Sequence, residues 1–135
     1  MRHLLAAALL ASSSAALACG YCVEDKIASV YDHAAITRVL AQKHHVVFFH
    51  VEGTLPSSLA SQRDIASRIA SAPGVDAGSA RFKPETATLA LAYDPARTSL
   101  GAVQAALEKR LARHKLSLMA LQIMERPGDL KTAKR

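Results

Sequence analysis

The sequence predicts an α+β fold in which a four-stranded antiparallel sheet carries two helices on one face, preceded by an extra helical segment. Two observations support this prediction. After residue 44 the apolar pattern changes between strand and helix periodicity in the order β-α-β-β-α-β. Right-handed crossover connections then place the four strands in one sheet and both helices on the same side of it.

Residues 1–18 have the composition of an export signal. A short basic start precedes an apolar run of Leu, Ala and Ser, and Ala16 and Ala18 occupy the two positions that a signal peptidase inspects. The apolar run is shorter than the ~20 residues that a membrane-spanning helix needs. We therefore expect a cleaved signal peptide and an exported, periplasmic protein. Residues 19–135 are enough for one domain.

Residues 19–44 form an N-terminal segment with two cysteines and a helical pattern. The sequence from Val23 to Lys43 contains neither Gly nor Pro. Its apolar residues lie on one helical face up to Tyr31 and on a different face from Ile36 onward. We therefore expect either one kinked helix or two short helices.

Residues 45–124 carry the predicted sheet and its two helices. Runs of β-branched and aromatic residues predict strands, 3.6-residue periodicity predicts helices, and Gly and Pro mark their ends. The expected elements are a strand His45–Gly53, a helix Ser57–Ala72, strands Ala77–Lys83 and Ala87–Tyr93 around a hairpin turn at Pro84–Thr86, a helix capped by Thr98 or Ser99, and a strand Leu116–Met124. This order is the ferredoxin-like βαββαβ sandwich. Residues 125–135 have no periodicity, so we expect a flexible basic tail.

Alternation along the strands assigns their side chains to two faces of the sheet. The face covered by the two helices is expected to carry Val47, Phe49, Val51, Leu89, Leu91 and Tyr93. The opposite face is partly apolar and carries Val46, Phe48, His50, Thr88, Ala90 and Ala92. A wide apolar surface is usually covered. We expect that the N-terminal helical segment packs across it or that the surface mediates self-association.

Of the net charge of +6, Arg2 contributes one and the rest comes from a single stretch of the chain. Basic and acidic residues balance over residues 19–107, whereas residues 108–135 hold eight basic and three acidic side chains. We expect no binding to nucleic acid, and a solvated tail explains the charge as well as attraction to an anionic surface does. No carboxylate pair, catalytic triad or phosphate-binding loop stands out, so we do not expect an enzyme.

From Val46 to Leu121 the sequence resembles the heavy-metal-associated domain family, the small ferredoxin-like modules of copper chaperones and metal-pumping ATPases. The markers, in chain order, are Val51-Glu52-Gly53, Pro73-Gly74-Val75, Ala87-Thr88-Leu89, Tyr93-Asp94-Pro95, Thr98-Ser99-Leu100 and Ala106-Leu107-Glu108. The resemblance implies the ferredoxin-like fold and a role in handling a soft metal ion.

The metal-binding loop of that family does not carry over to this chain. In the family, a Gly-Met-Thr-Cys-x-x-Cys loop follows the first strand, whereas residues 53–59 read GTLPSSL here. The cysteine positions fall on Pro56 and Leu59 in one register and on Ser58 and Ser61 in the other. Hydroxyls and apolar side chains do not replace thiolates for a soft ion, so we do not expect this loop to bind metal.

The two cysteines of the chain, Cys19 and Cys22, form a C-x-x-C at the expected new N-terminus, just before a helix. The amides and the positive dipole end of a helix N-terminus favour the thiolate. Two thiolates at this spacing can bind Cu(I), contribute half of a zinc site, or close a disulfide in an oxidising compartment.

Two other fates of these thiols stay open. The sequence Cys-Gly-Tyr-Cys resembles the active site of periplasmic thioredoxin-like disulfide isomerases, although in that fold the motif follows a strand and here it follows the signal. A cysteine directly after the cleavage point is also what lipoprotein processing requires, although lipoboxes usually have Leu at the position of Ala16. Lipidation would anchor the chain to a membrane through Cys19 and remove that residue as a ligand.

The histidines are weaker candidates for a metal site. His44, His45 and His50 cluster at the first strand, and His33 lies on the N-terminal helix. Two histidines on facing elements could complete a Cys-Cys-His site, but exposed or edge-strand histidines are the simpler interpretation. We retain His33 as a possible third ligand.

These observations give two functional hypotheses. The first is an exported protein that binds a soft metal, copper or zinc, through Cys19 and Cys22, with His33 as the possible third ligand. The alternative is a metal-free module that binds another envelope protein through its sheet surface or its basic end.

Overall fold

The computed structural model describes residues 22–134, and for residues 131–134 it describes the backbone only. The expected signal peptide and Cys19 lie outside the described residues. The elements are α1 (Val23–Val30), α2 (His33–Ala41), β1 (His45–Glu52), α3 (Leu59–Ala70), β2 (Arg81–Lys83), the 3₁₀ turn η1 (Pro84–Thr86), β3 (Thr88–Tyr93), α4 (Leu100–Leu111), η2 (Ala112–His114), β4 (Ser117–Met124) and η3 (Pro127–Lys134).

The four strands form one antiparallel sheet in the order β2-β3-β1-β4. With α3 and α4 packed on one face, this is the ferredoxin-like βαββαβ sandwich, and the predicted fold class is confirmed. The central strands pair in a regular register, in which Val47 lies opposite Leu91 and Phe49 opposite Leu89. The pairing of β1 with β4 shifts between Phe48 and Phe49, so β4 contains a bulge.

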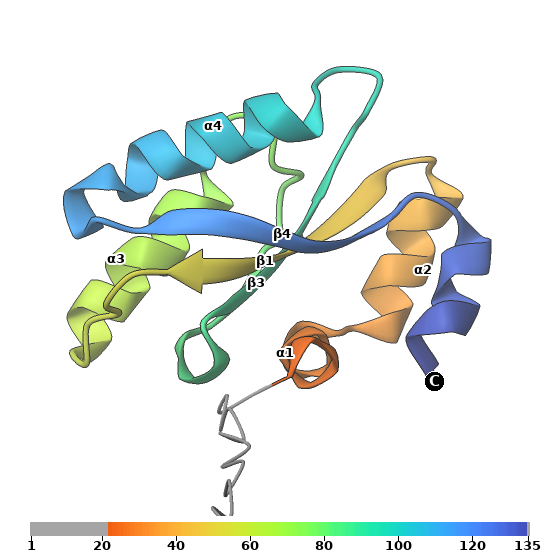
Figure 1. The fold of residues 1–135 in the computed structure, drawn as a ribbon. Coiled ribbons are helices and arrows are strands. Elements are labelled where there is room, and N and C mark those ends of the chain that lie inside the picture. The colour runs from red at the N-terminus through yellow and green to blue at the C-terminus, as the bar shows by residue number, and fades with distance from the viewer. Residues whose placement is uncertain (1–21, 135) are drawn as a thin grey trace, which may run out of the picture.

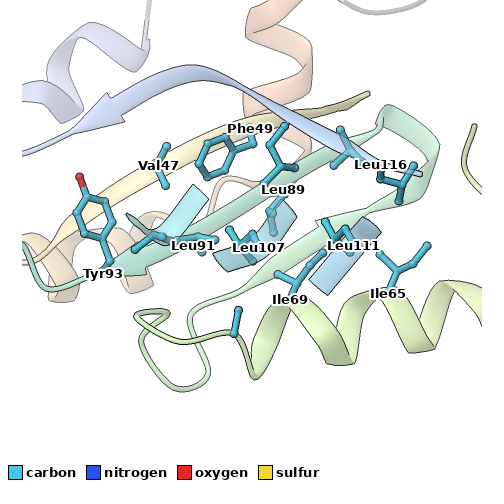
Figure 2. Close-up of a cluster of buried hydrophobic side chains, with 14 residues drawn as sticks. Val47, Phe49, Ile65, Ile69, Leu89, Leu91, Tyr93, Leu107, Leu111 and Leu116 are labelled. Carbon is cyan, nitrogen blue, oxygen red and sulfur yellow. The ribbon is translucent and has the colours of Figure 1, made fainter. Parts of the chain in front are cut away.

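The first hydrophobic core lies between the sheet and the helices α3 and α4 (Figure 1). Side chains from β1 and β3 point toward these helices, and Ile65, Ile69, Leu107 and Leu111 point back toward the sheet (Figure 2). The six residues assigned to this face from the strand alternation are all buried in this core. Strand alternation therefore identified the part of the main core that β1 and β3 contribute.

A second hydrophobic core lies on the opposite face, where α1 and α2 cover the sheet (Figure 1). The N-terminal segment contributes Ile27, Val30, Ile36 and Leu40, and the sheet contributes Val46, Phe48, Ala90, Ala92 and Met124. The expected packing of this segment across the second face is confirmed. Phe48 is fully buried, so the surface that would have mediated self-association is interior.

Two short helices, rather than one kinked helix, make up the N-terminal segment. The break lies at Tyr31 and Asp32, which both have extended backbone. The carboxylate of Asp32 accepts a hydrogen bond of 3.0 Å from the amide of Ala35 and caps α2. The break turns the second apolar stripe toward the sheet, which explains why the apolar face changes along the sequence.

The expected strand Ala77–Lys83 is too long, because β2 contains only Arg81–Lys83. Before it, the chain makes a turn with Gly78 at φ +72°. The backbone groups of Ala92 that face this edge are instead bonded to residues of the turn. Its amide donates to Oγ of Ser79 (3.0 Å), and its carbonyl oxygen accepts from the amide of Asp76 (2.8 Å). The hydroxyl of Ser79 thus accepts the hydrogen bond that a backbone carbonyl of a neighbouring strand would otherwise accept at this edge of the sheet.

The chain after β4 differs from the unstructured tail that we expected. Residues Pro127–Lys134 form the 3₁₀ helix η3, and Leu130 packs against the second core. The carboxylate of Asp129 accepts hydrogen bonds from the amides of Glu125 (2.8 Å) and Arg126 (3.0 Å). These bonds lower the pKa of Asp129 and fix the turn into η3. The packing of Leu130 depends on residues that are distant in the sequence, so local periodicity did not predict it.

None of the helices among residues 22–134 combines the length and the apolar character that crossing a bilayer requires.

Candidate metal site

Cys22 lies directly before the first turn of α1, as its N-cap residue. Its backbone is extended (φ −72°, ψ 166°), and its carbonyl oxygen accepts a hydrogen bond of 3.0 Å from the amide of Lys26. The Cys22 side chain is exposed and makes no capping hydrogen bond, so its sulfur is not used in holding the helix end. Cys19, the other expected ligand, lies outside the described residues.

The first turn of α1 places groups of opposite electrostatic effect near Cys22. The unpaired amides of a helix N-terminus favour an anionic sulfur. Glu24 and Asp25 stand in the same turn, and their carboxylates favour a nearby cation. A cation held at the thiols would therefore also be attracted by these two side chains.

His33 is not brought to Cys22. It is the first residue of α2 and is exposed, with Nδ1 3.3 Å from the hydroxyl of Tyr31. Cys22 precedes α1 and His33 follows it, and a helix of eight residues is ~12 Å long. The two side chains therefore belong to opposite ends of α1, and the structure gives no support to His33 as a third ligand beside Cys22.

The histidines of β1 and the loop before it are each bonded to a different neighbour. Nδ1 of His44 lies 2.6 Å from the Asp76 carboxylate, and Nδ1 of His45 lies 3.4 Å from the Tyr93 hydroxyl. Nδ1 of His50 lies 3.1 Å from the carbonyl oxygen of Ala87. Within residues 22–134, no three or more His, Cys, Asp or Glu side chains are grouped so that they could hold a metal ion.

The loop after β1 holds the start of α3 through hydrogen bonds. Oγ of Ser58 accepts a hydrogen bond from the amide of Ser61 (3.1 Å) and donates one to Oγ of Ser61 (2.9 Å). The carbonyl oxygen of Pro56 accepts from the Gln62 amide group (3.0 Å), and Leu59 is 68% exposed. At the family's cysteine positions, Ser58 and Ser61 thus take part in capping α3, Leu59 is exposed, and Pro56 accepts through its carbonyl oxygen.

A polar contact that the sequence did not reveal holds α1 on the sheet. Lys26 Nζ donates to the carbonyl oxygen of Thr86 (2.7 Å) and lies 3.3 Å from Nδ1 of His50. The hydroxyl groups of Ser29 and Thr86 lie 2.8 Å apart. The signal in the sequence was a lysine one residue before Ile27, on the side of the helix that faces the sheet. The sequence predicted that this segment packs on the second face, but it did not reveal Thr86 as the partner, because the two residues are 60 positions apart.

A cluster of charged side chains joins α3 to η2, the short helix that follows α4. Asp64 accepts hydrogen bonds from Arg68 Nε (2.8 Å) and from His114 Nε2 (2.9 Å). These two bonds, together with the charges of Arg68 and Arg113, lower the pKa of Asp64 from 3.8 to about 2. The ionised form of Asp64 is therefore stabilised mainly by the two side chains that bond to it.

Comparisons with known proteins give similarity of fold only. No protein-family model matches the chain, and no curated protein matches it. Oxidised MerP from Ralstonia metallidurans CH34, known from a crystal structure, is 22% identical with a TM-score of 0.45, and the match covers 58% of this chain and 99% of MerP. The yeast copper transporter domain Ccc2a, solved in the apo and Cu(I)-loaded states, is 17% identical with a TM-score of 0.42, and the match covers 58% of this chain and 96% of that domain.

Proposed function

We propose that this protein binds a soft transition metal ion, Cu(I) or Zn²⁺, between the thiolates of Cys19 and Cys22, and that it acts by binding and transfer rather than by catalysis. The observation that carries this proposal is the position of Cys22. It is exposed at the N-cap of α1, and its side chain is not used for capping. Soft thiolate ligands select Cu(I) and Zn²⁺ over hard cations.

The placement of α1 on the sheet supports the proposal. Lys26, one turn after Cys22, contacts Thr86 and His50, and His50 lies near the end of β1. Cys22 is therefore the N-cap of a helix that is held against the turn between β2 and β3, beside β1. In this proposal the ligands stand before an added helix instead of in the loop of residues 53–58.

Replacement of both thiols tests the proposal. We expect the protein purified under reducing conditions to bind one equivalent of Cu(I) or Zn²⁺ in a competition titration with a chromophoric chelator. Cys19→Ser with Cys22→Ser should abolish this binding and leave the far-UV circular dichroism spectrum unchanged. His33→Ala is the matched control and should keep the metal, because His33 lies at the other end of α1. Metal retained by the double serine variant, or no metal bound by the native chain, contradicts the proposal.

Export and the chemical state of Cys19 belong to the same proposal and need a separate measurement. In the proposal the chain is cleaved after Ala18, so that both cysteines lie at the new N-terminus. The intact mass of protein taken from its native envelope, under non-reducing and metal-retaining conditions, reports the cleavage point, a lipid, a disulfide and a bound ion together. A lipid on Cys19 or a catalytically active disulfide would contradict a two-thiolate metal site.

A second candidate function is a metal-free module that binds another envelope protein. The sheet surface first considered for this role is covered by α1 and α2. The observation that favours an interaction role is a basic groove between α3 and α4, lined by four cationic side chains. Partner binding that persists in the double serine variant would separate this function from metal binding.

A further inference from the structure

The groove between α3 and α4 is open and has a volume of about 450 Å³. Its lining consists of four cationic side chains and two small apolar residues, namely Arg68, Lys109, Arg110, Arg113, Pro73 and Ala106. No acidic residue is part of this lining. Pockets that bind small ligands or a few side chains have volumes of ~300–1,000 Å³, so the groove has the size of a binding site.

Two of the four cations are held in place by neighbouring side chains. Nε of Arg68 donates to Asp64, and Nη1 of Arg110 donates to Oγ of Ser71 across the helix pair (2.8 Å). Lys109 and Arg113 are exposed at the rim. The groove therefore combines two guanidinium groups of fixed orientation with two cations that can move toward a bound anion.

The carboxylate of Asp64, beside the groove, shows that side chains at this surface hold an anion. Its lowered pKa is caused first by hydrogen bonds from Arg68 and His114 and further by the charges of Arg68 and Arg113. Of these residues, Arg68 and Arg113 also line the groove, where carboxylates of a bound partner would meet them. Guanidinium groups suit carboxylates in particular, because their planar N–H pairs match the two carboxylate oxygens.

The charge along the groove argues against a uniform polyanion. A second groove shares Pro73 and Ala106 with the first and contains Asp76, Asp94 and Arg97 in its lining. The charged lining is therefore entirely basic in the first groove and mixed in the second. A nucleic acid or an anionic membrane would gain contacts at one end only, and a concave surface also fits a flat membrane poorly. A peptide can place acidic residues at the basic end and neutral residues beyond it.

We propose that the groove between α3 and α4 binds an acidic segment of a partner protein, with carboxylate side chains on Arg68, Lys109, Arg110 and Arg113 and small apolar side chains on Pro73 and Ala106. This site is independent of the thiols. It uses the excess basic charge at the end of α4. From the sequence alone, a solvated stretch explains that charge equally well. Electrostatic complementarity of this kind speeds association and sets the choice of partner.

A labelled peptide of alternating glutamate and alanine, titrated with the full chain by fluorescence polarisation, tests the proposal. The control peptide has glutamine in place of glutamate. The groove variant is Lys109→Glu with Arg113→Glu, and the matched control is Lys83→Glu with Arg126→Glu. All four positions are exposed, and both variants change the net charge equally. Circular dichroism and the melting temperature of each variant establish that it folds.

We expect the glutamate peptide to bind and the glutamine peptide not to bind. The dissociation constant should rise at least about tenfold in the groove variant and less than about twofold in the control. An equal loss in both variants, or no binding of the glutamate peptide by the native chain, would overturn the proposal. Equally tight binding of duplex DNA or of anionic vesicles, lost in the groove variant, would assign the groove to that polyanion and would also overturn it. Peptide binding by the double serine variant is expected to be unchanged, so the result does not depend on the metal site.

Discussion

The ammonium group of Lys26 donates a hydrogen bond of 2.7 Å to the carbonyl oxygen of Thr86 and so joins the first turn of α1 to the turn between β2 and β3. This contact ties the helix that follows Cys22 to the domain. Ser29 adds a second contact to Thr86 (2.8 Å), one turn later in α1. The helix that has Cys22 as its N-cap is thereby fixed to the folded surface.

Lys26→Met is expected to lower the free energy of unfolding by about 1.5–3 kcal/mol, because it removes a hydrogen bond from a charged donor and leaves the Thr86 carbonyl oxygen without it. Urea denaturation measures this loss. Lys83→Met is the matched control, since Lys83 is exposed on β2. Equal stability of the two variants would show that Lys26 does not hold α1 on the sheet.

Phe48→Ala tests whether the second core stabilises the fold. Phe48 is fully buried between the sheet and the N-terminal helices, so the substitution should cost about 3–5 kcal/mol of unfolding free energy. Leu59→Ala, at a position that is 68% exposed, should change it by less than about 0.5 kcal/mol. The prediction is wrong if denaturant unfolding gives a small loss for Phe48→Ala, because α1 and α2 would then not cover this face in solution.

Gly53→Ala is expected to destabilise the protein by at least about 1 kcal/mol more than Gly78→Ala does. Both glycines have positive φ, +117° at Gly53 and +72° at Gly78. A Cβ at residue 53 would lie 2.8 Å from the carbonyl oxygen of Lys115, whereas one at residue 78 meets nothing within 4 Å. Thermal unfolding of the two variants measures the difference, and equal losses would mean that only the backbone conformation matters.

The cluster around Asp64 predicts a loss of stability in acid. The pKa of Asp64 in the folded protein, about 2, lies below its ordinary value of 3.8, so ionised Asp64 stabilises the fold. This contribution is complete above pH 3.8 and disappears as the pH falls toward 2. The stability difference between the native chain and Asp64→Asn should therefore shrink over this range in urea titrations. A difference that is constant with pH would contradict the lowered pKa.

The sequence predicted those parts of the fold that side-chain periodicity and local capping residues specify. Alternation assigned the residues of β1 and β3 to the two faces of the sheet, and a cap expected at Thr98 or Ser99 marked the start of the last helix. Ser58 caps α3 and Ser99 caps α4. The length of β2 could not be predicted in the same way, because Ser79 replaces strand pairing through its hydroxyl, and this depends on where Ala92 lies.

For the candidate site, the sequence by itself determined that the chain has two thiols in a C-x-x-C before a helix and none in the loop after β1. The sequence also predicted that this helix packs on the second face of the sheet, but only the tertiary structure decided which residues hold it there, because Lys26 contacts Thr86 across 60 residues of sequence. Tertiary structure also decided that His33 and the histidines of β1 do not converge and that Arg68 meets Lys109 and Arg113 in one groove. Periodicity reports which face of an element is buried, but it carries no information on which distant side chain that face meets.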